Sequence, residues 1–484
     1  MTKAKTVLVY GKFKIVHPGH MRLFSHAIDL GDKLIIGIIK DEESNENIAF
    51  SETLLRNLPF VSEVVIEADA STIIRKTRPQ IIVKGFEHRE RESAELKAIK
   101  EVGAKLIYTS GNPFLTEKDL TDGLGSLLKV SIDLPKDFLQ RNSISINSLL
   151  NLASRVKDRR VLVLGDIIVD EYVACHSIGM SQEDPIVVNT PFGSNRYLGG
   201  AGIVAAHCSA LGANTQILSV VGDDDIANWV EEKLNEYDVG AKLFRDSIRP
   251  TTLKQRFKNN NQTLFRLSHF KQQVLEKELR IKMMHSIEDE LKDADLLIMS
   301  DFSYGVLDSE IAQFAISKAK KLGIQVAADS QSSSQVGNLG KFIGADHIFA
   351  TEREARLQLR DEYDGLAVLT SRLRKELISQ NMFLKIGADG VILEGVDSTV
   401  NSVLSTERIP ALNLRPVDAS GAGDSMLAAS ALMLSSGGTL SESAFLGSVV
   451  AAIQVGRQGN MPVMLEEVEQ VLKSSILNQT LSYG

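Results

Sequence analysis

The segment from Arg415 to Ala428 holds the residues best suited to chemistry. It reads Arg-Pro-Val-Asp-Ala-Ser-Gly-Ala-Gly-Asp-Ser-Met-Leu-Ala, which predicts an extended arm, a glycine-rich turn and a helix opening at Ser425. The backbone N–H groups of Gly421, Ala422 and Gly423 would face an anion at the helix N-terminus, with the carboxylate of Asp424 beside them. This pairing suits phosphoryl transfer to an alcohol, because the N–H groups stabilise the transferred group and the carboxylate accepts the hydroxyl proton. An ordinary glycine turn capped by an acid is the alternative, and the bare motif fits it equally well.

A second candidate site follows the first predicted strand, at residues 11–20. His17 and His20 lie three residues apart at the start of a predicted helix, after Gly11-Lys-Phe13. Both imidazoles could donate to the phosphates of a nucleotide, and the helix dipole would add to the attraction. The alternative is that one histidine caps the helix and the other is exposed.

Strands and helices alternate along both parts of the chain. Residues 6–10, 33–39, 64–66, 81–83 and 105–108 have strand character, as do later segments beginning at Arg160, Gln216, Ala294, Gln325, His347 and Phe383. The alternation predicts two doubly wound α/β domains with ligands at the carboxyl ends of parallel strands. Residues 173–197 and 251–267 are rich in β-formers and predict a small β lid. The irregular stretch 119–142 reads as a linker, so we expect domains at 1–142 and 143–484.

Composition sets limits on the partners and the location. The 484 residues carry a net charge of −8, and 43% of them are hydrophobic. No general basic surface for nucleic acid is expected, and no apolar run reaches the length of a membrane span. Only Cys175 and Cys208 are present, and no signal sequence precedes the first strand. A cytoplasmic location is therefore expected.

The second part of the chain, from about Arg160, resembles the ribokinase-like sugar kinases. The resemblance rests on Asp418-x-x-Gly-Ala-Gly-Asp424, with supporting motifs at Gly165-Asp166-x-x-x-Asp170 and Thr351-x-x-Glu354. It implies that Asp424 is the catalytic base and that residues 421–423 form the anion hole. The same resemblance implies roles for other positions: sugar contacts by Asp166, Asp170, Gly199, Gly200, Lys254, Arg256 and Arg266, ATP contacts by Lys385, Gly387 and Gly390, and orientation of Mg²⁺ by Glu354.

The first part resembles the cytidylyltransferase-like nucleotidyltransferases. The matching motifs are Gly11-x-Phe13, His17-x-Gly-His20 and Val83-Lys84-Gly85. The resemblance implies a Rossmann-like fold in which Gly11, Phe13, Lys84 and Gly85 contact a nucleoside triphosphate, ATP or CTP. It also implies attack by a substrate phosphate on the α-phosphate, with pyrophosphate leaving and Mg²⁺ assisting.

Several positions depart from these family patterns. In the first part Lys14 replaces an aspartate, the loop 41–53 lacks a lysine, and Asn112–Thr116 replaces a late Ser/Thr-Thr motif. In the second part Ile203 replaces an asparagine. Two further lysines are missing there, because Ser300-Asp-Phe-Ser-Tyr-Gly305 and Asp329-Ser-Gln331 contain none.

Together the two parts resemble the bifunctional heptose kinase/nucleotidyltransferase family with the domain order reversed. The resemblance implies that a sugar phosphate, expected to be a heptose phosphate, is phosphorylated at its anomeric hydroxyl and then joined to a nucleotide, in a homodimer. The composition adds the expectation that the protein contacts neither nucleic acid nor membrane. The open alternative is a sugar kinase whose N-terminal domain only binds nucleotide or regulates. A non-catalytic nucleotide sensor is a third hypothesis, and Asp424 argues against it.

Overall fold

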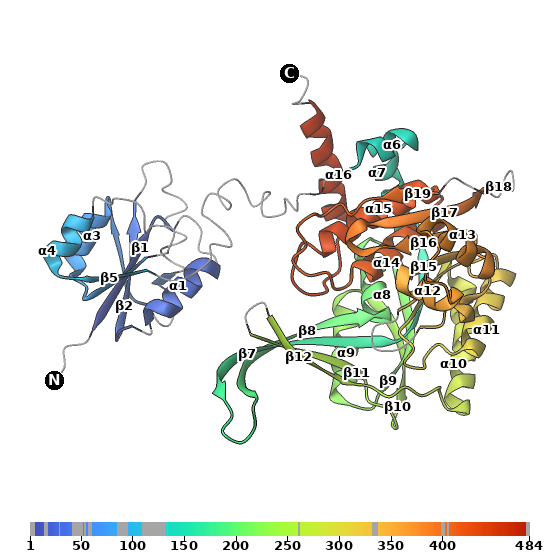
Figure 1. The fold of residues 1–484 in the computed structure, drawn as a ribbon, viewed down its shortest axis with the longest axis horizontal. Helices are drawn as coiled ribbons and strands as arrows, with labels where there is room; N and C mark the ends of the chain where they lie inside the picture. Colours follow the sequence, from blue (N-terminus) through green and yellow to red (C-terminus); the bar gives the residue numbers. More distant parts are fainter. Residues whose placement is uncertain are drawn as a thin grey trace. The chain divides into compact units, whose positions relative to one another are not determined.

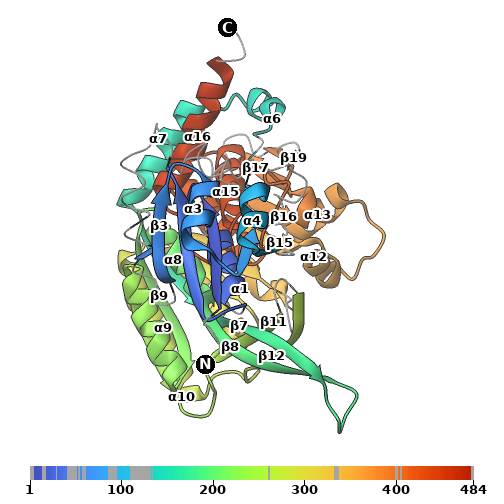
Figure 2. The same cartoon turned by 90° about the vertical axis from the view of Figure 1, so that its left-hand side faces the viewer.

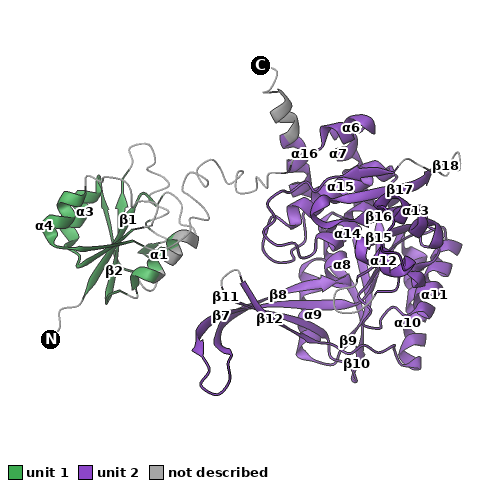
Figure 3. Cartoon of the chain, in the orientation of Figure 1, with its two compact units in different colours: residues 1–129 green, residues 130–484 purple. Residues whose placement is uncertain are grey.

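The chain folds into two compact units, residues 1–129 and 130–484, which Figure 3 distinguishes by colour. The computed structural model describes residues 5–13, 18–28, 30–40, 52, 55–56, 61–84, 95–108, 132, 134–259, 262–331, 337–397, 402–403 and 406–480. The expected domain boundary at residue 142 lies later than this division. Ile132, Leu134 and Phe138 already pack into the core of the second unit, and the ring of Phe138 stacks on that of Phe445 at 6.3 Å.

The first unit is built on a parallel sheet in the order β3-β2-β1-β4-β5. Its elements are β1 (Thr6–Gly11), α1 (Pro18–Ile28), β2 (Lys33–Ile39), β3 (Val61–Glu67), α3 (Ala70–Thr77), β4 (Ile81–Lys84), α4 (Leu96–Val102) and β5 (Lys105–Tyr108). Successive residues of β1 face opposite sides, with Val7 and Val9 in one core cluster and Leu8 in the other. The strand order reverses between β1 and β4, where ligands of such sheets bind. The predicted Rossmann-like fold of this unit is confirmed.

The second unit contains a long central sheet in the order β10-β9-β6-β13-β14-β15-β16-β17-β18, with β19 also paired to β17. The strands from β10 to β16 are parallel, and β17 to β19 pair antiparallel. The strands are β6 (Arg160–Gly165), β9 (Asn214–Gly222), β10 (Val239–Asp246), β13 (Leu296–Asp301), β14 (Gln325–Ser330), β15 (His347–Thr351), β16 (Asn381–Lys385), β17 (Val391–Asp397), β18 (Ser402–Val403) and β19 (Glu407–Ile409).

Helices cover both faces of this sheet, as Figure 1 shows. They are α6 (Lys136–Arg141), α7 (Ile146–Ser154), α8 (Ala201–Ala210), α9 (Asp225–Glu236), α10 (Lys277–Glu290), α11 (Ser309–Lys321), α12 (Glu352–Leu359), α13 (Leu366–Glu376), α14 (Ala422–Ser435), α15 (Leu440–Gln454) and α16 (Leu465–Thr480), with 3₁₀ turns at Arg155–Asp158, Leu291–Asp293, Leu339–Phe342 and Gly387–Asp389. Alternate residues of β6 divide between two cores, with Val161 and Val163 on the α8/α14 side and Leu162 and Leu164 on the α10/α11 side. The predicted doubly wound α/β fold of this unit is confirmed.

A separate four-stranded sheet forms the predicted lid, in the order β12-β11-β7-β8. Its strands are β7 (Ile167–Met180), β8 (Val187–Gly200), β11 (Thr252–Asn259) and β12 (Gln262–His269). The hairpin of β7 and β8 extends away from the central sheet in Figures 1 and 2. Only Asp166 separates the end of β6 from the start of lid strand β7 at Ile167, so the chain passes from core to lid without a loop.

Candidate active site

The glycine turn begins helix α14, one of the most deeply buried helices of the second unit. Gly421 is its N-cap with φ 78°, and a Cβ at this position would lie 2.0 Å from Oδ1 of Asn460. Only glycine fits both the backbone conformation and the space. The helix begins at Ala422, three residues before the predicted start, so Gly423 and Asp424 lie in its first turn, where N–H groups have no partner within the helix.

Asp424 lies at the positive end of this helix and is only 6% exposed as a residue. The side-chain amide of Gln331 donates a hydrogen bond to its Oδ1 at 2.5 Å. Burial raises the pKa of Asp424 to about 6, although the charge of Lys385 and the bond from Gln331 lower it. A carboxylate with a pKa near neutral pH is well matched to accepting a proton from a hydroxyl group.

Asp424 lines a cavity of about 870 Å³, which is large enough for a nucleotide and a sugar. Its lining residues come from the lid, from the carboxyl ends of the central strands and from an apolar segment after β19. The lining includes Asp170, Gly200, Lys254, Arg256, Gln331, Arg353, Glu354, Lys385, Gly387, Gly390, Gly421, Ala422, Gly423 and Asp424. The cavity therefore brings together most of the predicted residues of the second unit.

Asp170 belongs to lid strand β7 and is buried, at 9% exposure. Its Oδ1 pairs with Nη1 of Arg256 at 3.0 Å. Burial raises the pKa of Asp170, whereas the charges of Arg256 and Lys254 lower it. The predicted Gly199 is explained by this carboxylate, because a Cβ there would approach Oδ2 of Asp170 to 2.8 Å. Gly200 has φ 59° and lines the cavity beside it.

Asp166 has a different environment from the one its predicted sugar contact requires. It is 2% exposed, and its Oδ2 accepts N–H groups of Phe302 and Tyr304 at 2.8 and 3.3 Å. Its Oδ1 accepts the N–H of Val306 at 3.2 Å. Both oxygens therefore hold the turn after β13, and Asp166 does not line the cavity. The structure therefore brings Asp170 to the cavity but not Asp166, although the two acids belong to one Gly-Asp-x-x-x-Asp motif.

The lid presents basic residues on one face of two neighbouring strands. Lys254 and Arg256 alternate along β11 and line the cavity, and Arg266 stands directly opposite Arg256 on β12. The ammonium of Lys254 lies 5.3 Å from the ring centroids of both Phe302 and Tyr304. Arg266 is exposed and does not line the cavity. Like charges directly opposite each other are unfavourable, so this face is suited to an anion.

The nucleotide side of the cavity includes the predicted Lys385, Gly387 and Gly390. Gly390 has φ 99°, and a Cβ there would meet the carbonyl oxygen of Ile409 at 2.0 Å. Sequence reasoning did not identify the other wall, an apolar segment that runs from Pro410 to Pro416 and includes Leu414, which is 74% exposed. Two prolines bracketing apolar residues before the glycine turn were the available signal.

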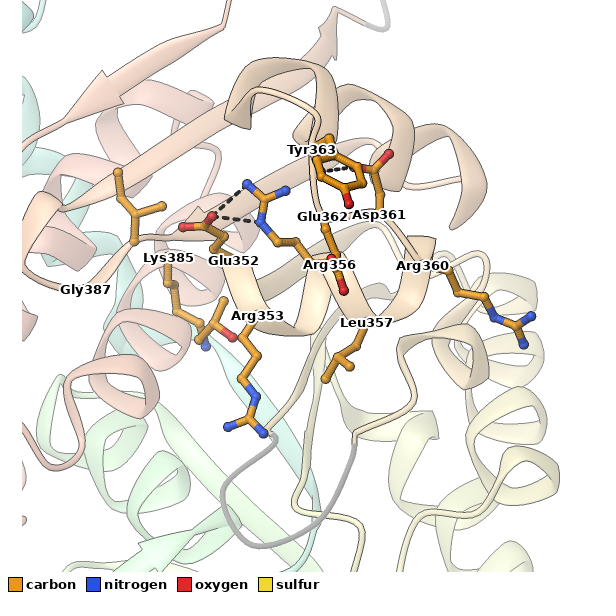
Figure 4. Close-up of a pocket in the computed structure, with 12 residues that line it drawn as sticks. Glu352, Arg353, Arg356, Leu357, Arg360, Asp361, Glu362, Tyr363, Lys385 and Gly387 are labelled. Carbon is orange, nitrogen blue, oxygen red and sulfur yellow. Dashed lines mark hydrogen bonds and ion pairs between the residues drawn. The ribbon is translucent and has the colours of Figure 1, made fainter.

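Lys385, at the end of β16, pairs with the buried Asp329 at the end of β14, with Nζ and Oδ2 2.5 Å apart. Burial alone would lower the pKa of Lys385, but the charges of Asp329, Glu354 and Asp424 raise it, so the ammonium stays charged. Figure 4 shows Lys385 and Arg353 among the residues that line a pocket of the second unit. No sequence pattern predicted this pair, because its members are 56 positions apart.

Glu354 lines the cavity from the first turn of α12, in a capping box with Thr351. The Thr351 N–H donates to its Oε2 at 2.7 Å. Among the described ranges, no group of three His, Cys, Asp or Glu side chains could hold a metal. A single carboxylate still fits Mg²⁺, which in kinases is held by one or two carboxylates, substrate phosphates and water.

In the first unit, the described candidate residues lie at the carboxyl end of β1 and β4. Phe13 is buried and has a positive backbone φ of 41°. Its ring packs edge-on against the His20 ring, with 4.9 Å between the ring centroids. Lys84 pairs with Glu95 at 2.6 Å, and the Tyr10 hydroxyl donates to the same carboxylate at 3.0 Å. The further candidates and departures lie outside the described residues, namely His17, Gly85, Lys14, the loop 41–51 with 53, and 112–116.

Comparisons with known proteins agree with this geometry. Residues 158–467 match the model of the pfkB family carbohydrate kinases. The chain belongs to this family. Residues 8–113 match the cytidylyltransferase-like model, which covers the sheet of the first unit.

Curated relatives extend the comparison. The chain is 30% identical over 319 residues to the bifunctional protein HldE of Nitratiruptor sp., a match covering 65% of each protein. It is 28% identical over 329 residues to the protein of the same name from Helicobacter hepaticus, covering 66% of this chain and 65% of that one. The chain thus spans slightly less than two thirds of the length of these relatives.

Solved structures share the fold of the second unit. A ribokinase from Arabidopsis thaliana complexed with ribose and ATP aligns with TM-score 0.52 and 17% identity, covering 65% of this chain and 99% of that one. Phosphofructokinase-2 from Escherichia coli, in its tetrameric inhibited form, aligns with TM-score 0.54 and 15% identity over the same shares. Among the described residues, no helix has the length and apolar character needed to cross a membrane.

Proposed function

We propose that this chain is a bifunctional enzyme of sugar nucleotide synthesis. The second unit transfers a phosphoryl group from ATP to the anomeric hydroxyl of a sugar phosphate, with a heptose phosphate as the expected acceptor. The first unit then joins the sugar 1-phosphate to a nucleotide from ATP or CTP. The observation that carries the proposal is one cavity in which Asp424 and the glycine turn lie among lid residues and nucleotide-side residues.

In the kinase step, Asp424 accepts the proton of the sugar hydroxyl while the oxygen of that hydroxyl forms a bond to the transferred phosphorus. The bond from that phosphorus to the oxygen of the leaving ADP breaks. The N–H groups of Gly421, Ala422 and Gly423 stabilise the charge on the transferred group. Asp170 is suited to orient the sugar, because a carboxylate accepts hydrogen bonds from hydroxyl groups. Mg²⁺, bound through Glu354, phosphates and water, would neutralise charge on the phosphates.

The lid supports an acceptor that already carries a phosphate. Lys254, Arg256 and Arg266 outnumber the single Asp170 on this face, and Arg256 and Arg266 stand opposite each other. Arginine pairs well with phosphate oxygens because its fork presents two parallel donors. We therefore expect Arg266→Gln to raise KM for the phosphorylated sugar more than for the same sugar without its phosphate.

The alternative role for the first unit, nucleotide binding without turnover, has one structural observation in its favour. Lys84, a predicted triphosphate contact, is engaged by Glu95. Hydrogen bonds from Lys84 and Tyr10 lower the pKa of Glu95, although burial opposes them, so the carboxylate stays ionised and retains the lysine. A triphosphate would have to compete with this carboxylate.

A homodimer through the lid completes the proposal. The outer part of the β7–β8 hairpin exposes large apolar side chains, with Ile178 at 68%, Met180 at 63%, Ile186 at 58% and Phe192 at 63%. Apolar side chains clustered on a projecting hairpin are typical of interaction surfaces. Sedimentation velocity of the intact protein is the direct test, and a concentration-independent monomer would argue against the dimer.

The two activities can be tested by separate variants of the full chain. Asp424→Asn should stop formation of the sugar 1-phosphate from ATP, while pyrophosphate release from supplied sugar 1-phosphate continues. His17→Ala and His20→Ala should do the reverse. If the kinase activity survives Asp424→Asn, the assigned base is wrong. If the chain with intact His17 and His20 never releases pyrophosphate with any sugar 1-phosphate, the first unit serves only to bind or regulate.

A further inference from the structure

Lys385 lines the kinase cavity and places a positive charge there. It lies at the carboxyl end of β16, and only 11% of its side chain is exposed. Its ammonium contacts Asp329, whose own side chain is fully buried. Lys385 therefore lines the cavity, whereas its buried partner Asp329 does not, and one oxygen of Asp329, Oδ1, has no hydrogen bond among the described residues.

The same ammonium reaches the glycine turn. A Cβ built on Gly423 would lie 3.3 Å from Nζ of Lys385 and 3.9 Å from the amide nitrogen of Gln331. That amide is hydrogen-bonded to Asp424. Lys385 thus adjoins Gly423, one of the residues of the proposed anion hole, and its charge acts on the proposed base Asp424. A phosphoryl group held by the turn would lie within reach of the ammonium.

The surrounding charges show why a cation is needed at this point. Asp329, Glu354, Asp424 and Asp170 are all buried around the cavity, and the incoming phosphates would add further negative charge. At the positions where the resembling kinases carry lysines, this chain has Gln331 and Tyr304. Gln331 is neutral and is engaged with Asp424. Lys385 is the cation that β16 brings to the same place.

We propose that Lys385 contacts the phosphoryl group during its transfer. It thereby supplies the positive charge that is missing at position 331, where this chain has glutamine in place of lysine. Its flexible stem lets the ammonium shift between Asp329 and a phosphate oxygen. Charge spreads over the oxygens of the transferred group in the transition state, where a preorganised cation is most effective. The inference rests on the proposed kinase activity. The competing explanation is that Lys385 only neutralises Asp329.

Nucleotide binding provides a first test that is independent of the sugar. The probes are a non-hydrolysable ATP analogue and ADP, each with Mg²⁺, titrated calorimetrically into the full chain. Lys385→Gln should weaken binding of the ATP analogue relative to ADP by about 10-fold or more, and Lys385→Arg by less. Lys341→Gln is the matched control, because Lys341 pairs with the buried Asp301 at 2.7 Å and does not line the cavity. An equal loss for both nucleotides in Lys385→Gln would overturn the proposal.

The double variant Asp329→Asn/Lys385→Gln separates the two explanations by rate. If Lys385 acts on the phosphoryl group, the double variant keeps the reduced kcat of Lys385→Gln, and its KM for the sugar stays near the wild-type value. If Lys385 only balances Asp329, removing both charges restores kcat, and the proposal fails. Absence of sugar phosphorylation by the wild-type chain would instead refute the kinase activity, while the comparison of ATP analogue and ADP would still decide whether Lys385 contacts the terminal phosphate.

Discussion

The acid limb of the kinase pH profile should report the ionisation of Asp424. Its pKa is raised from 3.8 to about 6 by burial. Only the ionised carboxylate accepts the hydroxyl proton, so the active fraction is about 90% at pH 7 and about 10% at pH 5. We therefore expect kcat to fall about tenfold between these pH values. A carboxylate with an ordinary pKa of 3.8 would lose almost nothing over the same interval.

The assay is steady-state ADP production at saturating ATP, Mg²⁺ and sugar phosphate, from pH 4.5 to 8.5. Phosphate groups of the substrates also titrate near pH 6, so a variant must identify the group responsible. The charged groups that act on Asp424 are Lys385 and Lys254, which lower its pKa, and Asp170, which raises it. Lys385→Gln removes a favourable charge and should move the acid limb to higher pH. A limb that stays at the same pH in this variant, or a flat profile down to pH 5, would refute the assignment of Asp424 as the titrating base.

Three further perturbations have defined outcomes. Asp424→Asn should raise the free energy of unfolding of the second unit by up to about 3 kcal/mol at pH 8, measured by urea unfolding. The reason is that the folded-state pKa of Asp424 is raised, so the ionised carboxylate costs stability above pH 6. The gain should shrink as the pH falls through 6, and a loss of stability would contradict this reasoning. Gly421→Ala should lower kcat at least about tenfold while circular dichroism shows that the fold is retained. The added Cβ would clash with the Asn460 side chain, and the backbone φ of 78° at this position disfavours alanine. An unchanged kcat would exclude a role for this turn. Phe192→Ser with Ile178→Ser should shift the sedimentation coefficient from dimer towards monomer, and an unaltered coefficient would place the interface elsewhere.

Local patterns were enough to predict the fold. Alternation of strand and helix identified both α/β units, and the β-rich stretches identified the lid, because each signal lies within about ten residues. The glycine turn before Asp424 could also be predicted from the sequence, because the positive φ of 78° at Gly421 requires glycine at that one position. The structure also brings the predicted Asp170 to the cavity, from strand β7 of the lid.

Contacts between distant segments were beyond the reach of the sequence. Asp166 and Asp170 look alike in one motif, and only the turn after β13 shows that Asp166 caps three N–H groups. The loss of a lysine at Gln331 was visible, but the approach of Lys385 from another strand was not. Such pairings depend on the order of strands in the sheet, which periodicity does not encode.

The first unit illustrates the same limit. The sequence placed Lys84 at the carboxyl end of its strand, and the structure agrees. Its pairing with Glu95, which follows eleven positions later, had no signature in the motif. The family pattern therefore predicted where the lysine lies and left open which group holds it before a nucleotide arrives.

The central claim is that one chain makes a sugar 1-phosphate and then activates it. The most direct measurement is ³¹P NMR of the wild-type protein with a heptose phosphate, Mg²⁺ and either ATP alone or ATP with CTP. The account predicts an anomeric phosphate resonance that rises first and is then replaced by diphosphate signals of a nucleotide sugar, together with pyrophosphate. A spectrum in which ATP and the heptose phosphate remain unchanged would contradict the kinase assignment, and an anomeric phosphate that accumulates without pyrophosphate would contradict the second activity.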